Sequence, residues 1–400
     1  MTTIHADTAD TVADAVREAY DAGRRLEVVG TGSRCGYGRP VDADAVLDVS
    51  GLSGIVDYDP AELVLTARPG TPIAEITALV AGHGQHLSFD PPDLAPLWGG
   101  ASGSGTLGGM LGLGLGGSRR VSAGGPRDHF LGFAAVNGRG EHFSAGGKVI
   151  KNVTGYDLPK LLAGSLGTLA VLTEVTIKVL PAPRAAATLT WFGLGDRAAI
   201  AAMTRALNSP MVLQAAAHVP AACGACADGV RAVTRLHLAG VPVAVAANAA
   251  NLADLLGDFG VPETIHDAEA IWRDLGGVER FTKPGEIVWR IVLPPSAAAA
   301  FTAALNPASN PRWFYDWGGG LVWVILPDAA DGHAEMVRTA LAATAGADGH
   351  ATLIRAPDAV RRAVAPFQPL APALAALSDR VRQRFDPGGV LNPGRIWATS

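Results

Sequence analysis

Residues 28–38 read Val28-Val29-Gly30-Thr31-Gly32-Ser33-Arg34-Cys35-Gly36-Tyr37-Gly38, a short apolar strand that runs directly into a glycine-rich turn. Gly30 and Gly32 carry no Cβ, so the chain can take positive φ there and a ligand can come close to the main chain. Consecutive amide groups in such a turn can converge on an anion. The stretch therefore predicts an anion site with room for a diphosphate, although a plain surface turn would have the same composition.

Two well-known nucleotide-binding loops do not fit this stretch. A Rossmann fingerprint would place a helix after the turn and an acidic residue such as Asp48 further along the chain. Gly36, Gly38 and Pro40 disfavour that helix, whose N-terminus should face the pyrophosphate. A Walker A loop requires Gly-Lys followed by Ser or Thr, and the turn lacks this sequence. The predicted anion site therefore belongs to another fold.

A second glycine-rich stretch covers residues 99–117, in which ten of nineteen residues are glycine. It contains the turn Thr106-Leu107-Gly108-Gly109, and Arg127 and Asp128 follow further along the chain. Backbone with few side chains, a hydroxyl group and buried amides suits a flat aromatic ring with imide and carbonyl groups, such as a flavin. A disordered linker would also be rich in glycine, but linkers seldom include large apolar residues such as Trp98.

Hydrophobic periodicity places regular elements around these turns. Apolar residues at helical spacing predict a helix from Val12 to Ala19, and short apolar runs predict strands at Leu26–Val29, Leu63–Arg68 and Thr168–Leu180. Thr71, which precedes Pro72, is predicted to be the N-cap of a further helix. Residues 184–378 follow two prolines and alternate strand-like with helix-like runs, which predicts a separate α+β domain with helices on one side of a sheet.

A third segment contains Lys151-Asn152-Val153-Thr154-Gly155-Tyr156-Asp157-Leu158 and then Gly164-Ser165-Leu166-Gly167-Thr168-Leu169. Together with the two earlier turns, this gives four motifs in an order that resembles the FAD-binding domain of the vanillyl-alcohol-oxidase and p-cresol-methylhydroxylase (PCMH) family. The resemblance implies an α+β fold: a two-lobed PCMH-type FAD-binding domain at residues 1–183, an α+β cap domain at 184–378, and a C-terminal segment at 379–400 that returns to the FAD-binding domain.

The same resemblance implies roles for individual residues, with FAD held non-covalently. The expected diphosphate contacts are Gly30, Thr31, Gly32, Ser33 and Arg34, and the expected contacts near the flavin ring are Thr106, Leu107, Gly108 and Gly109. The turn and strand from Gly167 to Val171 would hold the adenine end. Arg127 and Asp128 could contact the cofactor or form a structural ion pair, and Asn392 could approach the flavin or form only a turn.

Within that family the likeness narrows to one type of subunit. Residues 151–158, Trp289-Arg290-Ile291, Asp316-Trp317-Gly318-Gly319 and the tail from Asp386 to Arg395 resemble the FAD-binding subunit of bacterial glycolate oxidase. This implies oxidation of glycolate, or a related small 2-hydroxy acid, to the 2-oxo acid, together with a second flavoprotein subunit and an iron–sulfur subunit. Two alternatives stay open: a non-catalytic assembly subunit, and a freestanding dehydrogenase that binds a carboxylate through Arg290 and Arg355.

Neither a catalytic base nor a metal site is assigned from the sequence. The His-rich signatures of related 2-hydroxy-acid dehydrogenases are missing, and the histidines are scattered, as His83, His86, His333 and His350 illustrate. Cys223 and Cys226 have the spacing of a redox or metal motif, but an iron–sulfur cluster normally needs four ligands and the chain has three cysteines. Cys223 and Cys226 are therefore interpreted as small loop residues.

Composition excludes several other functions. A hydrophobic fraction of 48% with 17% charged residues predicts folded domains rather than disorder. The net charge of −5 and the lack of a long run of Lys or Arg give no indication of a basic surface that would bind nucleic acid or an anionic membrane. Three cysteines form no disulfide framework, which favours a cytoplasmic protein. Any attachment to the inner membrane would then be peripheral, through partner subunits.

Overall fold

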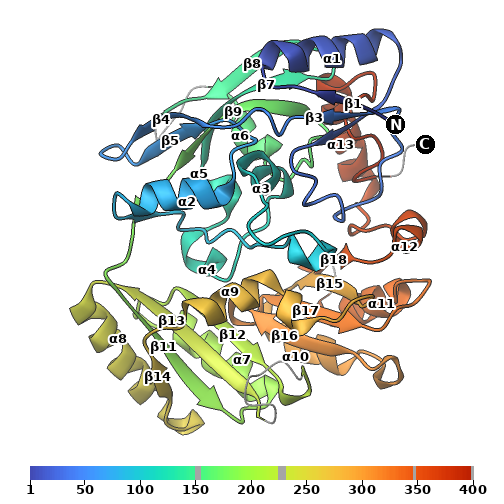
Figure 1. Ribbon diagram of the computed structural model, residues 1–400. Coiled ribbons are helices and arrows are strands. Elements are labelled where there is room, and N and C mark those ends of the chain that lie inside the picture. Colours follow the sequence, from blue (N-terminus) through green and yellow to red (C-terminus); the bar gives the residue numbers. More distant parts are fainter. Residues whose placement is uncertain (149–154, 224–230, 346–347, 398–400) are drawn as a thin grey trace. The chain divides into compact units, whose positions relative to one another are not determined.

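The computed structural model describes residues 1–148, 155–223, 231–345 and 348–397 (Figure 1). The chain forms two compact units. Unit 1 consists of Met1–Gly116, Gly124–Pro181 and Pro369–Ser400, and unit 2 of Gly117–Ala123 and Ala182–Gln368. The short segment Gly117–Ala123 thus belongs to unit 2 although both of its flanks lie in unit 1. The domain boundaries at 183 and 378 stay a prediction.

The first lobe of unit 1 is a three-stranded parallel sheet, in the order β1 (Thr2–His5), β3 (Ala45–Asp48), β2 (Leu26–Val29). Helix α1 (Ala9–Asp21) begins after Thr8, whose hydroxyl accepts a hydrogen bond from the Thr11 amide. Its buried apolar face joins the same core as Leu26 and Leu47, so the predicted helix and the strand Leu26–Val29 are both confirmed. The C-terminal tail adds to this lobe, because the Leu26 amide donates to Val390 O.

The second lobe of unit 1 is a five-stranded antiparallel sheet. Its order is β4 (Ile55–Asp59), β5 (Val64–Ala67), β9 (Ala170–Lys178), β7 (Phe130–Asn137), β8 (His142–Gly146). The helices of unit 1 after α1 are α2 (Ile73–Ala81), α3 (Leu107–Leu113), α5 (Pro126–His129), α6 (Leu158–Leu162) and α13 (Pro372–Phe385), and a two-stranded pair joins β6 (Gln85–His86) to β10 (Leu180–Pro181). Side chains of α2 and α3 form one core with β5, β7 and β9.

One expected helix boundary is wrong. Helix α2 begins after Pro72, without a side-chain cap, and Thr71 lies outside it. The Thr71 hydroxyl donates to Arg68 O at 2.7 Å and accepts from the Gly54 amide at 2.9 Å. Thr71 therefore fixes the turn before the helix, because its hydroxyl finds backbone partners upstream that the local sequence does not reveal.

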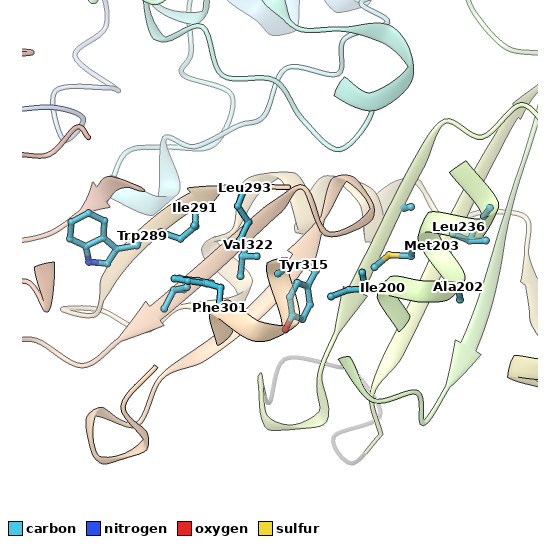
Figure 2. Packing of buried hydrophobic residues seen from close by; sticks show 14 of the residues in the cluster. Ile200, Ala202, Met203, Leu236, Trp289, Ile291, Leu293, Phe301, Tyr315 and Val322 are labelled. Carbon is cyan, nitrogen blue, oxygen red and sulfur yellow. The ribbon is translucent and has the colours of Figure 1, made fainter. Parts of the chain in front are cut away.

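Unit 2 is an eight-stranded antiparallel sheet with helices packed on it. The strand order is β14 (Glu263–Ile265), β11 (Ala185–Phe192), β13 (Val233–Gly240), β12 (Ala215–Val219), β16 (Arg312–Asp316), β17 (Leu321–Leu326), β15 (Ile287–Val292), β18 (His350–Arg355). Its helices are α4 (Arg120–Ala123), α7 (Asp196–Leu207), α8 (Pro242–Leu255), α9 (Glu269–Gly277), α10 (Pro295–Ala303), α11 (Ala334–Ala345) and α12 (Asp358–Ala363). Alternate strand residues and the inner faces of α7, α8, α10 and α11 share one core, part of which Figure 2 shows around Met203, Phe301 and Tyr315.

Candidate functional site

Three glycine-rich segments that lie far apart in the sequence line one cavity in unit 1. Residues 28–35, 106–113 and 162–172 contribute to its wall, and Asn392 and Arg395 reach it from the C-terminal tail. Gly30, Gly108 and Gly167 are all among the lining residues. The cavity encloses about 950 Å³ of space outside protein atoms, its opening to solvent included.

The turn after β2 presents a row of backbone donors at this cavity. Within the described part of the chain, the amides of residues 30–34 donate to no acceptor, whereas those of Cys35 and Tyr37 donate to Gly32 O and Arg34 O. The Thr31 hydroxyl donates to Ser104 O at 2.7 Å and so ties the turn to the second glycine-rich segment. Backbone donors without partners bind anions, and this row matches the anion site predicted from sequence.

Arg34 places a buried positive charge in the same wall. Its Nε and Nη1 atoms are buried and have no hydrogen-bond partner among the described residues. A Cβ on Gly105 would lie 2.8 Å from Nη2, so a larger residue there would displace the guanidinium. Burial lowers the pKa of Arg34 to about 10, with the charge of Asp93 opposing the change. A buried cation without a contacting anion is costly, and an anionic ligand such as a diphosphate would offset that cost.

Asn392 joins two walls of the cavity. Its Oδ1 accepts from the Val28 amide and its Nδ2 donates to Leu166 O, both at 2.8 Å. The side chain is buried, and a Cβ on Gly167 would lie 2.8 Å from Nδ2, where φ is +67°. Residue 167 therefore has to be glycine for both steric and backbone reasons. Asn392 positions the turn at Leu166 against β2, which is a role that an Asn-Pro-Gly turn alone does not predict.

Arg395 is a lining residue that sequence reasoning missed. Its guanidinium donates to Glu27 Oε1 and to Arg34 O, each at 3.1 Å. The contact with Arg34 O holds the turn in place, and the ion pair with Glu27 is largely buried. The only signal in the sequence was the position of Arg395 directly after the Asn-Pro-Gly turn, since its partners lie more than 360 residues away.

The glycine turn at 106–109 contributes main-chain surface to the cavity wall, and few hydrogen-bond donors. Thr106 caps α3 by accepting from the Gly109 amide, and Thr106, Gly108 and Gly109 line the cavity. The amides of Leu107 and Gly108 donate to Thr71 O and Pro69 O. The Leu107 side chain lies in the core and does not line the cavity. Two of the amides expected to face a ligand thus donate to backbone carbonyl groups of the protein instead. The segment supplies a part of the cavity wall that has few side chains.

Comparison with known proteins identifies the fold and the cofactor. Residues 2–146 match the model of the FAD binding domain. The chain superimposes with a TM-score of 0.74 on 4-ethylphenol oxidase from Gulosibacter chungangensis, at 16% identity, covering 99% of this chain and 89% of that one. The chain superimposes on p-cresol methylhydroxylase with a TM-score of 0.71 at 14% identity, and the match covers 98% of this chain and 88% of that one. The predicted PCMH-type α+β fold and the predicted cofactor, FAD, are confirmed.

A full-length relative decides the family. The chain is 34% identical over 394 residues to "Glycolate oxidase subunit GlcE" of Escherichia coli, covering 98% of both chains. The chain belongs to the GlcE family. It is also 33% identical over 168 residues to "Glycolate oxidase subunit GlcD" of Bacillus subtilis, covering 41% of this chain and 34% of that protein. A "D-lactate dehydrogenase" of Archaeoglobus fulgidus matches 36% of the chain at 34% identity. This member of the family is therefore an FAD-dependent oxidoreductase.

Arg127 and Asp128, which the resemblance also implies, do not line the cavity. Arg127 Nε donates to Lys160 O at 3.1 Å, and Asp128 Oδ2 accepts from the Gly125 amide at 2.8 Å at the start of α5. Neither lines the cavity, so a contact with the cofactor stays a prediction for both. The family motif at 151–154 lies outside the described residues.

The part of the chain that the structure describes was searched for metal-ligating clusters and for membrane-spanning helices. Within these residues no three His, Cys, Asp or Glu side chains gather as a metal site would require. Cys35 lines the cavity and Cys223 is buried, whereas Cys226 lies outside the described residues. Across the same residues, no helix combines the length and the apolar character that crossing a membrane needs.

Proposed function

We propose that this chain is the FAD-binding subunit of a glycolate oxidase complex, which oxidises glycolate or a related small 2-hydroxy acid to the 2-oxo acid. The match to GlcE over 98% of both chains carries the proposal. Shorter matches to proteins named for D-lactate and D-2-hydroxyglutarate support the substrate class, because both are 2-hydroxy acids. The cavity in unit 1 supports the site, since its wall combines backbone donors with a buried cation.

Each segment of the cavity wall has a distinct task in this proposal. The amides of residues 30–34 and the Arg34 guanidinium bind the diphosphate, where charge-assisted hydrogen bonds are strong. Thr106, Gly108 and Gly109 lie along the flavin ring, and Gly167 to Val171 along the adenine end. Asn392 holds the two outer segments at a fixed separation. FAD supplies a two-electron acceptor for the hydroxy acid, and the protein supplies its position and electrostatic surroundings.

The proposed partners are a second flavoprotein subunit and an iron–sulfur subunit. Two of the relatives are named as subunits of glycolate oxidase, which supports a multisubunit assembly. The second of these, GlcD, is 33% identical to this chain over 168 residues, which supports two subunits that share a related region. Electrons would leave this flavin singly through the assembly. Association with the inner membrane would occur through those partners.

The absorbance spectrum of the isolated chain tests the proposal. We expect a flavin spectrum that is bleached by anaerobic glycolate, and by D-lactate if the substrate range is broad. A yellow chain that glycolate fails to bleach would favour the assembly role, in which the FAD of this subunit is structural. In the purified complex, Gly30→Val should reduce turnover of glycolate together with FAD content, because a side chain there meets Thr106 Oγ1 at 3.3 Å. Full turnover by a complex whose variant subunit lacks FAD would refute a redox role for this site.

A further inference from the structure

Helix α8 (Pro242–Leu255) carries apolar residues on both of its faces. On the inner face, Val245 and Leu252 are buried in the core of unit 2, where the helix packs on β11 and β13 (Figure 1). On the outer face, Val243 is 81% exposed. Surface helices usually expose polar residues, and a helix that is apolar on all sides is normally buried. Asp254 is the only charged residue of α8, so its outer face has the composition of a contact surface.

The outer face of α8 consists of Val243, Ala247, Ala250 and Asp254, all of which are exposed. They follow one another at intervals of four, three and four residues, which places them on one side of the helix. These intervals are the same when they are read from either end. If two copies of α8 pack antiparallel, Val243 of each copy therefore faces Asp254 of the other, and Ala247 faces Ala250. The outer face is thus complementary to itself in register.

Each end of α8 carries a charge of the same sign as the helix dipole at that end. Asp254 lies in the last turn, where the dipole is negative and where the helix has no basic residue. The first turn has no acidic residue and no side-chain cap, and the amides of Val243 and Ala244 donate to no acceptor among the described residues. Arg184, which is exposed, lies beside this positive end, because its amide donates to Gly240 O at 3.0 Å. Within one chain, both ends of α8 therefore lack the opposite charge that would stabilise them.

We propose that the outer face of α8 binds the same face of a second copy of this chain, with the two helices antiparallel about a twofold axis. The Asp254 carboxylate of each copy then lies at the uncapped first turn of the other helix and near its Arg184, so that opposite charges meet at both ends. Parallel helices would bring the two Asp254 carboxylates together, which is unfavourable. The alanines at the centre let the helix axes approach to about 8 Å. Because the same face is used on both copies, the contact closes at a dimer.

The size of the contact sets the expected affinity. Helix α8 has 14 residues. At a rise of 1.5 Å per residue, such a helix is about 21 Å long. A contact between two helices of this length buries less than the roughly 1,200–2,000 Å² that is typical of stable interfaces. We therefore expect a weak dimer, with a Kd of about 1–100 µM.

Sedimentation equilibrium of the full chain loaded with FAD measures this dimer directly, at concentrations from about 1 to 200 µM. Ala250→Arg should weaken the dimer at least about 100-fold, because it places a large charged side chain at the centre of an apolar contact. Asp254→Asn should weaken it about 3- to 30-fold and reduce its dependence on salt, because two contacts with a helix terminus are lost in each dimer. Ala343→Arg is the matched control, since Ala343 is exposed on α11 of the same unit, and it should leave the Kd unchanged. Circular dichroism and FAD content show whether each variant is folded.

Disulfide cross-linking tests the direction of the two helices. In the antiparallel pair the two copies of residue 250 are separated by about 4–5 Å along the helix axes, whereas the two copies of residue 243 are separated by about 16 Å. A disulfide requires Cα atoms within about 7 Å of each other. Under mild oxidation, Ala250→Cys should therefore form a covalent dimer and Val243→Cys should not. The unsubstituted chain, with its own three cysteines, is the control.

Three results would overturn the proposal. The first is a chain that stays monomeric at the highest concentration, and the second is a dimer whose Kd changes less than twofold with Ala250→Arg in a folded variant. The third is a covalent dimer formed through Val243→Cys, which would exclude the antiparallel arrangement. If the isolated chain is monomeric and Ala250→Arg instead releases another subunit from the purified complex, the outer face of α8 belongs to that subunit and not to a second copy. None of these measurements depends on the oxidation of glycolate.

Discussion

Replacing Arg34 by methionine should weaken FAD binding and at the same time stabilise the FAD-free protein. The two effects have opposite signs because the guanidinium has buried nitrogens without a partner among the described residues and lies in the wall of the proposed FAD cavity. A purely structural arginine would behave differently, since its removal lowers stability and ligand binding together. Methionine retains most of the aliphatic stem and fills irregular space well, so little packing is lost.

The magnitude follows from the pKa of Arg34, which burial lowers from 12.5 to about 10. At about 1.36 kcal/mol per pKa unit, the charged form costs the folded state about 3 kcal/mol at neutral pH. After allowance for lost contacts, we expect Arg34→Met to raise the free energy of unfolding of the FAD-free protein by about 1–2 kcal/mol. This corresponds to an increase of roughly 2–8 °C in Tm for a domain of this size. Loss of a hydrogen bond to a charged group costs about 1.5–3 kcal/mol, which weakens FAD binding roughly 10- to 100-fold.

Thermal unfolding of the FAD-free protein and fluorescence titration with FAD measure the two quantities on the same preparation. Arg24→Met is the control, because Arg24 forms an exposed ion pair with Glu18 and should change neither quantity. An Arg34→Met protein that is less stable without FAD than the wild type would refute the interpretation of an uncompensated buried charge. Unchanged FAD affinity would refute the assignment of Arg34 to the diphosphate.

Three further predictions concern the stability of each unit. Gly167→Ala should lower the free energy of unfolding in urea more than Gly164→Ala does. Both glycines have positive φ, so each substitution costs about 1–2 kcal/mol in backbone strain, but only at Gly167 does the new Cβ meet Asn392. Equal losses in the two variants would contradict the steric argument. Asn392→Ala should cost about 2–5 kcal/mol in the same assay, since it breaks two hydrogen bonds that join β2 to the turn at Leu166, and a loss below 1 kcal/mol would count against that role. The pKa of His237 is about 4 in the folded state and 6.5 when unfolded, so its contribution to stability is complete above pH 6.5 and is lost as the pH falls toward 4. His237→Gln should therefore remove about 2 kcal/mol of the acid-induced loss between pH 7 and pH 5, and an unchanged pH dependence would refute the lowered pKa.

The turn at residues 30–34 shows how much of the site can be predicted from residues that are neighbours in the sequence. Glycine content, the preceding apolar strand and the absence of a following helix were enough to predict an anion site of a type other than Rossmann or Walker A. These features depend on the conformational freedom of individual residues, which the residue type determines directly. The order of the glycine-rich motifs then gave the family, which the full-length match to GlcE confirms.

Thr71 and Asn392 show where local reasoning stops. Thr71 was expected to cap α2 and instead bonds the backbone of Arg68 and Gly54, and only the folded chain brings Asn392 to Val28 and Leu166. A polar side chain contributes according to the donors, acceptors and charges around it after folding, and sequence spacing does not fix those distances.

The sequence alone predicted the type of fold and the cofactor through the resemblance of its ordered motifs to the PCMH family, and its glycine content, a local property of the chain, marked the three segments that line the cavity. Only the tertiary structure decided that two nitrogens of Arg34 are buried and unpaired among the described residues, and that Asn392 and Arg395 return to contact β2 and the first turn. These contacts join residues separated by up to several hundred positions, and long-range packing of the whole chain is what brings them together.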